Sequence, residues 1–128
     1  MTKPLQQINV SLRIIDSDTV EYTYIDPITN ERVTTEDCKL ELPQPACCLF
    51  LLDAETSSEG WTITSIMPNG TAPINFDIGP FGLSVATHCQ TGSTSVYRFY
   101  IVYYNTLTHL TYFIDPQEQN TPPASPPN

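Results

Sequence analysis

The stretch "VYRFYIVYYNTLTHLTYFI", residues 96–114, decides the expected fold. Two runs of aromatic and β-branched residues, 96–104 and 109–114, flank the polar connection "NTLT". Residues of these classes are typical of β-strands, and two strands joined by a short turn form a hairpin. We therefore expect a long β-hairpin in this part of the chain.

Both faces of this hairpin carry aromatic side chains. Because side chains alternate along a strand, Phe99 and Tyr103 fall on one face, and Tyr100 and Tyr104 fall on the other. One face can pack in a core. The other either forms cross-strand aromatic pairs or is an exposed surface that binds a sugar, a peptide or a second subunit. Tyrosine tolerates both environments, so the sequence leaves the two interpretations open.

The segment "QEQNTPPASPPN", residues 117–128, reads by composition as a disordered Pro-rich tail after a β-sandwich domain at 1–116. A polyproline II segment nevertheless loses little entropy on docking, and aromatic grooves are its usual receptors. We therefore expect the tail to contact tyrosines of this chain or of a second copy. The predicted interaction surface comprises Tyr97, Tyr100, Tyr104, Tyr112, Pro122, Pro123, Pro126 and Pro127.

Strand patterns continue through the rest of the chain. Most runs alternate apolar and polar residues, whereas "ACCLFLL" is apolar on both faces, as in a strand between two layers. About nine strands with regular turn signals predict an all-β, two-layer antiparallel β-sandwich of immunoglobulin-like or related Greek-key topology. The expected strands are 8–14, 19–25, 38–42, 46–52, 61–67, 74–78, 83–89, 96–104 and 109–114.

The apolar positions of these strands define the expected core. "DPITNERV" is expected to be a loop or hairpin connection with Asn30 in a left-handed turn, and "DAETSSEG" an exposed acidic loop. The predicted core comprises Ile8, Val10, Leu12, Leu40, Leu42, Cys48, Phe50, Leu52, Ile63, Val85, Phe99 and Ile101.

The charge balance excludes whole classes of partner. The net charge is −9 and the pI is about 4.3, with only five Lys and Arg residues scattered along the chain. Nucleic acids and anionic membranes are recognised by clustered cations, so neither is an expected partner. The N-terminal residues lack a signal-peptide pattern, and no apolar run is long enough to cross a bilayer. We therefore expect a cytoplasmic protein.

No arrangement of residues indicates catalysis, a metal site or a cofactor. The spacing Cys48…Trp61…Cys89 is similar to that of immunoglobulin domains, but Thr87 stands where their conserved tyrosine would be. In the reducing cytosol buried thiols are expected rather than disulfides. A nucleophilic Cys89 paired with His88 or His109 would make the chain a hydrolase, and this is the least favoured interpretation.

The pattern "YFIDP", followed by Glu118 and 120–123, resembles the uncharacterised bacterial DP-EP family of small all-β proteins. The resemblance covers about the last quarter of the chain, and Glu118 is not followed directly by proline as in the family's second dipeptide. A weaker similarity is to PixA-type bacterial inclusion-body proteins. The resemblance implies an all-β fold and brings no activity or catalytic residues.

Two functions from different classes follow. The first is a non-enzymatic acidic β-sandwich that self-associates, as a homodimer or larger, or binds a protein partner. The second is a carbohydrate-binding module that stacks sugars on Trp61 or on the hairpin tyrosines. A sugar module needs exposed aromatic rings, so the exposure of Trp61 and Tyr100 distinguishes the two.

Overall fold

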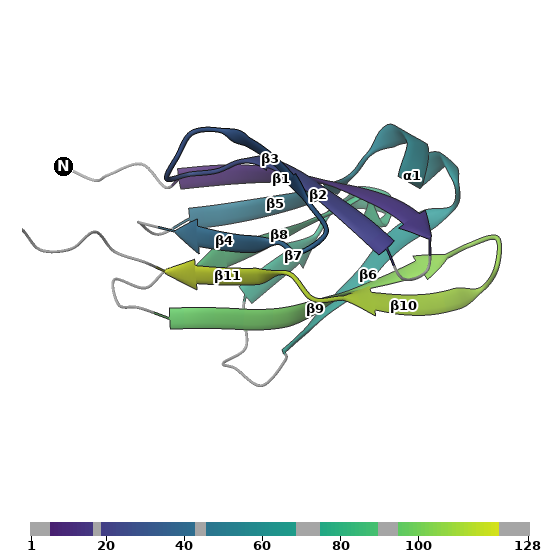
Figure 1. Ribbon diagram of the computed structural model, residues 1–128. Coiled ribbons are helices and arrows are strands. Elements are labelled where there is room, and N and C mark those ends of the chain that lie inside the picture. The colour runs from purple at the N-terminus through teal and green to yellow at the C-terminus, as the bar shows by residue number, and fades with distance from the viewer. Residues whose placement is uncertain (1–5, 17–18, 43–45, 69–74, 90–94, 121–128) are drawn as a thin grey trace, which may run out of the picture.

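The computed structural model describes residues 6–16, 19–42, 46–68, 75–89 and 95–120, which form two facing β-sheets (Figure 1). This is the all-β, two-layer sandwich that the strand patterns predict. The first sheet has six strands in the order β3-β2-β1-β5-β8-β7. These strands are β1 (Gln6–Asp16), β2 (Thr19–Ile25), β3 (Arg32–Thr35), β5 (Ala46–Leu52), β7 (Asn75–Ile78) and β8 (Ser84–Cys89).

The second sheet is built around β9 (Ser95–Asn105). One edge of β9 pairs with β6 (Trp61–Pro68). The other edge pairs first with β10 (Leu110–Ile114) and then with β11 (Gln117–Asn120). Strand β4 (Lys39–Leu42) pairs with β11. The long hairpin expected from the sequence is therefore the centre of this sheet.

Strands β10 and β11 are two parts of one line along β9. Ile114 lies opposite Ile101, and Gln117 lies opposite Arg98. The number of residues between the two pairs is therefore the same on β9 as on the line of β10 and β11. The register is thus unbroken. The interruption falls at Pro116, which has no N–H to donate to a ladder.

The domain boundary expected at residue 116 does not coincide with the end of the sheet. Gln117–Asn120, which were expected to begin the tail, form β11 and pair with strands on both sides. Their polar composition carries no apolar alternation, which is why the sequence did not predict a strand there. Residues 121–128 lie outside the described part of the chain.

Two of the strand pairs are parallel, namely β1 with β5 and β4 with β11, whereas the others are antiparallel. The sequence predicted an antiparallel sandwich. Alternation of apolar and polar residues reports which face a side chain takes, but it does not report the direction of the neighbouring strand. Both parallel pairs join strands that are distant in the sequence and are connected through the opposite sheet.

The core lies between the sheets and agrees with the predicted list. Phe50 of β5 and Phe99 of β9 make an edge-on contact, with ring centroids 6.1 Å apart, that joins the two layers. Every predicted core residue with a described side chain is at most 9% exposed; the side chain of Leu42 is outside the described set. The core also contains Ile14, Val20, Tyr22, Tyr24, Cys38, Ala46, Trp61, Ile66 and Tyr103.

The acidic loop expected after β5 contains a short helix, α1 (Ala54–Ser58). Asp53 caps it by accepting a hydrogen bond from the Thr56 N–H at 2.8 Å. The Thr56 hydroxyl in turn accepts a buried bond from the Ile14 N–H at 3.0 Å, which ties the helix to β1. One turn is too short to show helical periodicity in a sequence. Within the described ranges, no helix is long and apolar enough to cross a membrane.

The β2–β3 connection is a hairpin, one of the two forms expected. Asn30 has a φ of 60°, which confirms the predicted left-handed turn residue. Residues Arg32–Thr35 continue as β3, the edge strand of the first sheet.

Candidate functional site

The aromatic residues of the second sheet separate into two groups, one on each face. The inner group consists of Trp61, Tyr103 and Tyr112. The Trp61 ring lies 5.2 Å from the Tyr103 ring and 5.6 Å from the Tyr112 ring, centroid to centroid, and the two tyrosines stack at 5.8 Å. Trp61 is only 9% exposed. These rings therefore belong to the core.

The burial of this inner group does not favour two of the expectations from the sequence. Trp61 was a candidate platform for sugar stacking, but its faces are covered by two tyrosines. Tyr112 was placed in the interaction surface, yet it is partly buried and packs against the core. Side chains alternate between the two faces of a strand, and both residues stand at positions that face the core.

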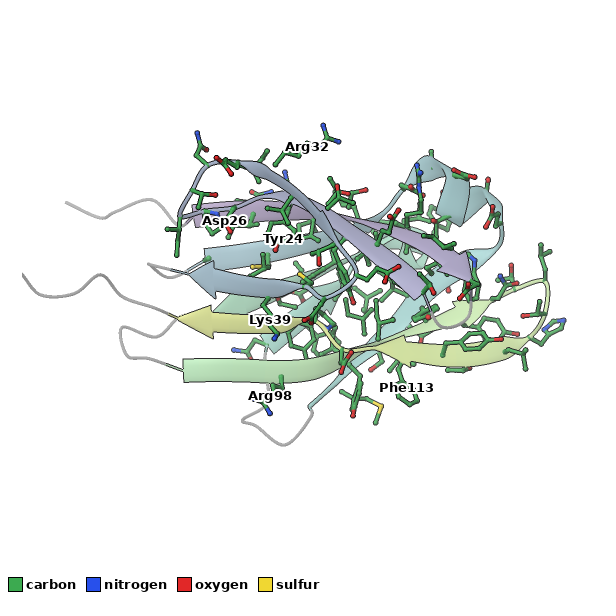
Figure 2. All side chains as sticks on the ribbon, in the orientation of Figure 1. Tyr24, Asp26, Arg32, Lys39, Arg98 and Phe113 are labelled. Atoms are coloured by element: carbon green, nitrogen blue, oxygen red, sulfur yellow. The ribbon has the colours of Figure 1, made fainter. Side chains whose placement is uncertain are left out.

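The outer group defines the candidate functional site. We use the name outer aromatic face for the apolar and aromatic residues that β6, β9 and β10 direct away from the core: Met67, Tyr100, Val102, Tyr104 and Phe113. Phe113 is 64% exposed and Met67 is 52% exposed. Figure 2 shows Phe113 and Arg98 projecting from the β9–β10 side of the sandwich, away from the first sheet. The core does not account for this face.

Tyr100 and Phe113 form the centre of the outer aromatic face. Their ring centroids are 4.9 Å apart and their planes are inclined at 70°, an edge-to-face pair between adjacent strands. Met67 of β6 lies directly opposite Tyr100 on the other edge of β9. The inclined rings do not form the coplanar exposed pair that sugar stacking requires.

A β-bulge in β6 places Met67 on the outer face. Ile63 lies opposite Tyr103, but Ser65 lies opposite the next residue of β9, so Thr64 is the extra residue. The Thr64 hydroxyl donates a hydrogen bond to the Val102 carbonyl at 3.2 Å. The bulge reverses the alternation of the strand, which buries Ile66 and exposes Met67.

Tyr104 is held at the turn end of the outer aromatic face. Its hydroxyl is hydrogen-bonded to Nδ1 of His109 at 2.7 Å. Asn105 closes the turn, because its Oδ1 accepts bonds from the N–H groups of Leu107 and Thr108. This end of the face is thus fixed by the β9–β10 turn.

The fold separates Cys89 from His109, one of the two histidines considered for hydrolysis. Cys89 is paired in register with Ala46, the first residue of β5, at one end of the sandwich. His109 lies in the β9–β10 turn at the other end (Figure 1). Cys38, Cys47 and Cys48 are present as thiols. Cys48 and Cys89 stand on neighbouring strands of one sheet, so their spacing does not bridge the two layers. Among the described residues, no cluster of His, Cys, Asp or Glu could hold a metal ion.

Part of the predicted interaction surface cannot be placed. The backbone of Tyr97 lies opposite Glu118, but its side chain is outside the described set. The four prolines Pro122, Pro123, Pro126 and Pro127 also lie outside the described residues. Of the predicted tyrosines, the structure brings Tyr100 and Tyr104 onto one face.

Comparison with known proteins adds no family. Neither a scan against protein-family models nor a search of curated proteins finds a match for this chain. The resemblance to the DP-EP family therefore stays a prediction. In the structure, the Asp-Pro element that carries it is the point at which the line of β10 and β11 is interrupted.

Proposed function

We propose that this is a non-enzymatic, acidic β-sandwich protein that acts by self-association, with the outer aromatic face as the contact. The observation that carries the proposal is the exposure of Phe113 and Met67 beside Tyr100. Contiguous apolar and aromatic side chains on a sheet face are typical of association surfaces. Aromatic residues also supply most of the energy in such contacts.

A two-fold dimer suits this face. An isologous contact uses the same residues from both copies, so each aromatic residue of the surface contributes to the contact from both copies. The five residues of the outer aromatic face are uncharged, and Arg98 lies beside them on β9, although the chain as a whole has a net charge of −9. Two copies can therefore approach there with little local repulsion. Arg98 and Asp115 are exposed near the Tyr100 end, where opposite charges of two copies can meet.

Sedimentation velocity at micromolar concentrations tests this proposal. We expect the wild type to sediment as a dimer or larger species. Phe113→Arg should weaken self-association by tenfold or more, because it places two cations at the centre of the contact. Far-UV circular dichroism of the variant should remain that of an all-β protein, since Phe113 is not part of the core.

The matched control is Ile15→Arg. Ile15 is 53% exposed, comparable to the residues of the outer aromatic face, but it stands on β1 in the first sheet. This control should leave self-association unchanged. A monomeric wild type, or an equal loss of association in both variants, would contradict the proposal.

A further inference from the structure

The first sheet is split at one end, where β1 and β2 separate. Their antiparallel register begins at Asp16 and ends at the pair Ser11–Thr23. Beyond this pair β1 continues as a strand because it pairs with β5, and β2 continues because it pairs with β3. Among the described residues, Val10 and Tyr24 would form the next pair, and Asn9 and Ile25 the pair after it, but neither pair belongs to the register.

The backbone groups of the separated strands face the split. The Leu12 carbonyl accepts a bond from the Asp53 N–H at 2.9 Å, so the even-numbered residues of β1 direct their N–H and C=O groups towards β5. The odd-numbered residues must then direct theirs towards β2, because the two directions alternate along a strand. Gln7 and Asn9 therefore present one donor and one acceptor each to the split.

The same argument applies to β2. The Asp26 N–H donates to the Glu31 carbonyl at 2.8 Å, so the even-numbered residues of β2 face β3. Ile25 therefore directs its backbone groups towards β1, and Pro27, the next odd-numbered residue, has no N–H to leave unsatisfied.

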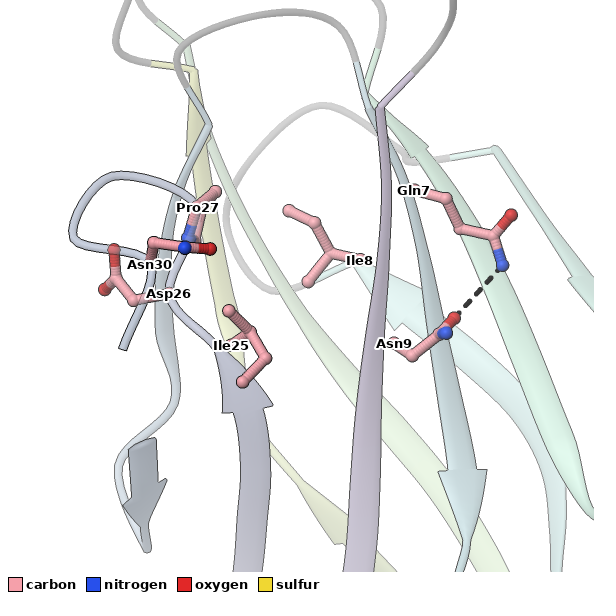
Figure 3. Close-up of a pocket in the computed structure, with 7 residues that line it drawn as sticks. All are labelled: Gln7, Ile8, Asn9, Ile25, Asp26, Pro27 and Asn30. Atoms are coloured by element: carbon pink, nitrogen blue, oxygen red, sulfur yellow. Dashed lines mark hydrogen bonds between the residues drawn. The ribbon is translucent and has the colours of Figure 1, made fainter. Parts of the chain in front are cut away.

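The split is open as well as unpaired. Its end is a pocket of about 320 Å³ lined by Ile8, Asn9, Ile25 and the turn that contains Asp26, Pro27 and Asn30. Figure 3 shows Ile8 and this turn on the same side of β1, whereas the side chains of Gln7 and Asn9 lie on the other side and are hydrogen-bonded to each other at 3.0 Å.

A second concavity continues the opening onto the outer surface of the sheet. It has a volume of about 270 Å³, and Asn9 and Ile25 line it as they line the first. Its wall is completed by Ser11, Thr23, Tyr24, Arg32 and Leu51. We call this opening between β1 and β2 the slot; Asn9 and Ile25 line both of its concavities, and backbone groups of the two strands face it.

We propose that this slot accepts an extended segment of another protein, which adds to β1 as a strand. Unpaired backbone groups at strand spacing are well suited to bind another extended backbone. The occupant must be a chain end or an open loop, because β2 and its turn leave no room for a second sheet. Apolar side chains suit the walls formed by Ile8, Ile25 and Leu51.

Charge and backbone chemistry further restrict which segments can occupy the slot. The net charge of −9 favours a segment flanked by basic residues. The chain's own segment 121–128 is a poor occupant, because four of its eight residues are prolines, which cannot donate to a ladder. This inference concerns the first sheet and is independent of the dimer proposed through the second.

Amide hydrogen exchange on the full-length protein tests the slot itself. Without any peptide, the N–H of Asn9 should exchange at least a hundredfold faster than the N–H of Val10, which faces β5. Equal protection of the two would show that the slot is already filled, and this would overturn the inference. If that protection were lost on removal of residues 121–128, the occupant would be the chain's own tail.

Binding is measured with a short synthetic peptide in which valine and threonine alternate between terminal lysines. We expect saturable binding, and protection of the Asn9 N–H on addition of the peptide. The matched peptide with alternate backbone nitrogens methylated should not bind, because it cannot donate. Equal binding of the methylated peptide, or no binding of either, would contradict strand addition.

Two substitutions at one position complete the test. Asn9→Ala removes the side chain and keeps the N–H, so it is the reference against which the peptide affinity of Asn9→Pro is compared. Asn9→Pro removes the N–H that faces the slot and should weaken binding by about fivefold to tenfold, the effect of one hydrogen bond. Proline is tolerated at strand positions whose N–H is unpaired, so the melting temperature should remain close to that of Asn9→Ala. Unchanged affinity in Asn9→Pro would disprove the role of this edge.

Discussion

Tyrosine occupies different environments in this fold, and burial changes the acidity of two of these residues. Tyr22 and Tyr24 are buried on the inner face of β2, whereas Tyr100 and Tyr104 lie partly exposed on the outer face of β9. Burial and the nearby Cys38 raise the pKa of Tyr24 to about 12. The same causes raise the pKa of Tyr22 even further.

The raised pKa values of Tyr22 and Tyr24 predict a loss of stability at alkaline pH. In the unfolded chain tyrosines ionise near pH 10, whereas the buried pair keeps its protons in the fold. The stabilisation is complete below about pH 10 and declines as the pH rises towards 12 and beyond. Urea denaturation between pH 8 and 11.5 should show this decline. Tyr24→Phe should reduce its slope, and an unchanged slope would show that Tyr24 is accessible.

Asp53 is the residue on which the short helix depends. Although partial burial opposes ionisation, hydrogen bonds from Thr56 and Arg13 lower the pKa of its carboxyl. The Arg13 Nε lies 2.8 Å from Asp53 Oδ2. The charged form is therefore stabilised by the fold, and its contribution is present above about pH 4 and lost as the pH falls.

Two substitutions of Asp53 distinguish the stabilising effect of its N-cap hydrogen bond from that of its negative charge. Asp53→Ala should lower the free energy of unfolding by about 1–2 kcal/mol, because the helix loses its N-cap. Asp53→Asn keeps a cap acceptor and should cost less than half as much at pH 7. Its difference from the wild type should disappear near pH 3. Thermal denaturation at both pH values measures this, and equal losses in the two variants would mean that the cap contributes nothing.

At the scale of elements, a single glycine brings the 3-10 turn Pro80–Gly82 against β6. Gly82 has a φ of 66°, and a Cβ there would lie 2.6 Å from the Ile63 carbonyl oxygen. This close approach joins the entry of β8, in the first sheet, to a strand of the second.

Gly82→Ala should therefore destabilise the protein by about 1–3 kcal/mol, since both the backbone conformation and the contact are unsuited to a side chain. The control is Gly79→Ala, where φ is −76° and the nearest group is the Ser84 hydroxyl, which rotation about one bond can move away. Chemical denaturation should rank Gly82→Ala as the costlier change. The reverse ranking would refute the close approach.

Strand β11 predicts different outcomes for two truncations. Removal of 117–128 takes away the only described neighbour of β4 and uncovers Leu40, which is 1% exposed. Uncovering one such side chain costs about 1.5–3 kcal/mol, and the lost ladder adds to this, so we expect a large drop in melting temperature.

Removal of 121–128 leaves β11 intact. The proposal that the tail prolines contact tyrosines of a second copy predicts weaker self-association for this shorter truncation, with little change in melting temperature. Sedimentation velocity and differential scanning calorimetry on both truncations distinguish the two effects. If the shorter truncation associates as the full chain does, the prolines take no part in the contact.

For the molecule as a whole, the charge of −9 opposes the proposed self-association, and salt should relieve it. The Debye length falls from about 10 Å at 0.1 M to about 3 Å at 1 M ionic strength. We therefore expect the dimer dissociation constant to decrease as NaCl is raised over this range. A dissociation constant that increases with salt would instead indicate that contacts between Arg98 and Asp115 dominate the interface.

The sequence by itself determined the fold class and part of the core. Strict alternation in β1, β2 and β9 fixes which side chains face inwards, because a strand has only two faces. For the same reason the sequence placed Tyr100 and Tyr104 together, opposite Phe99 and Tyr103. It could not show that Trp61 is covered, since burial of an end residue depends on the partner strand.

Only the tertiary structure decided the features that depend on neighbours distant in the sequence. The bulge at Thr64 reversed the faces of β6, and the polar residues Gln117–Asn120 became a strand because β4 and β9 supply partners for their backbone. The split between β1 and β2 likewise arises because each strand follows a different neighbour. Backbone hydrogen bonds are the same for every residue except proline, so pairing of this kind leaves no pattern in the side chains from which a sequence could predict it.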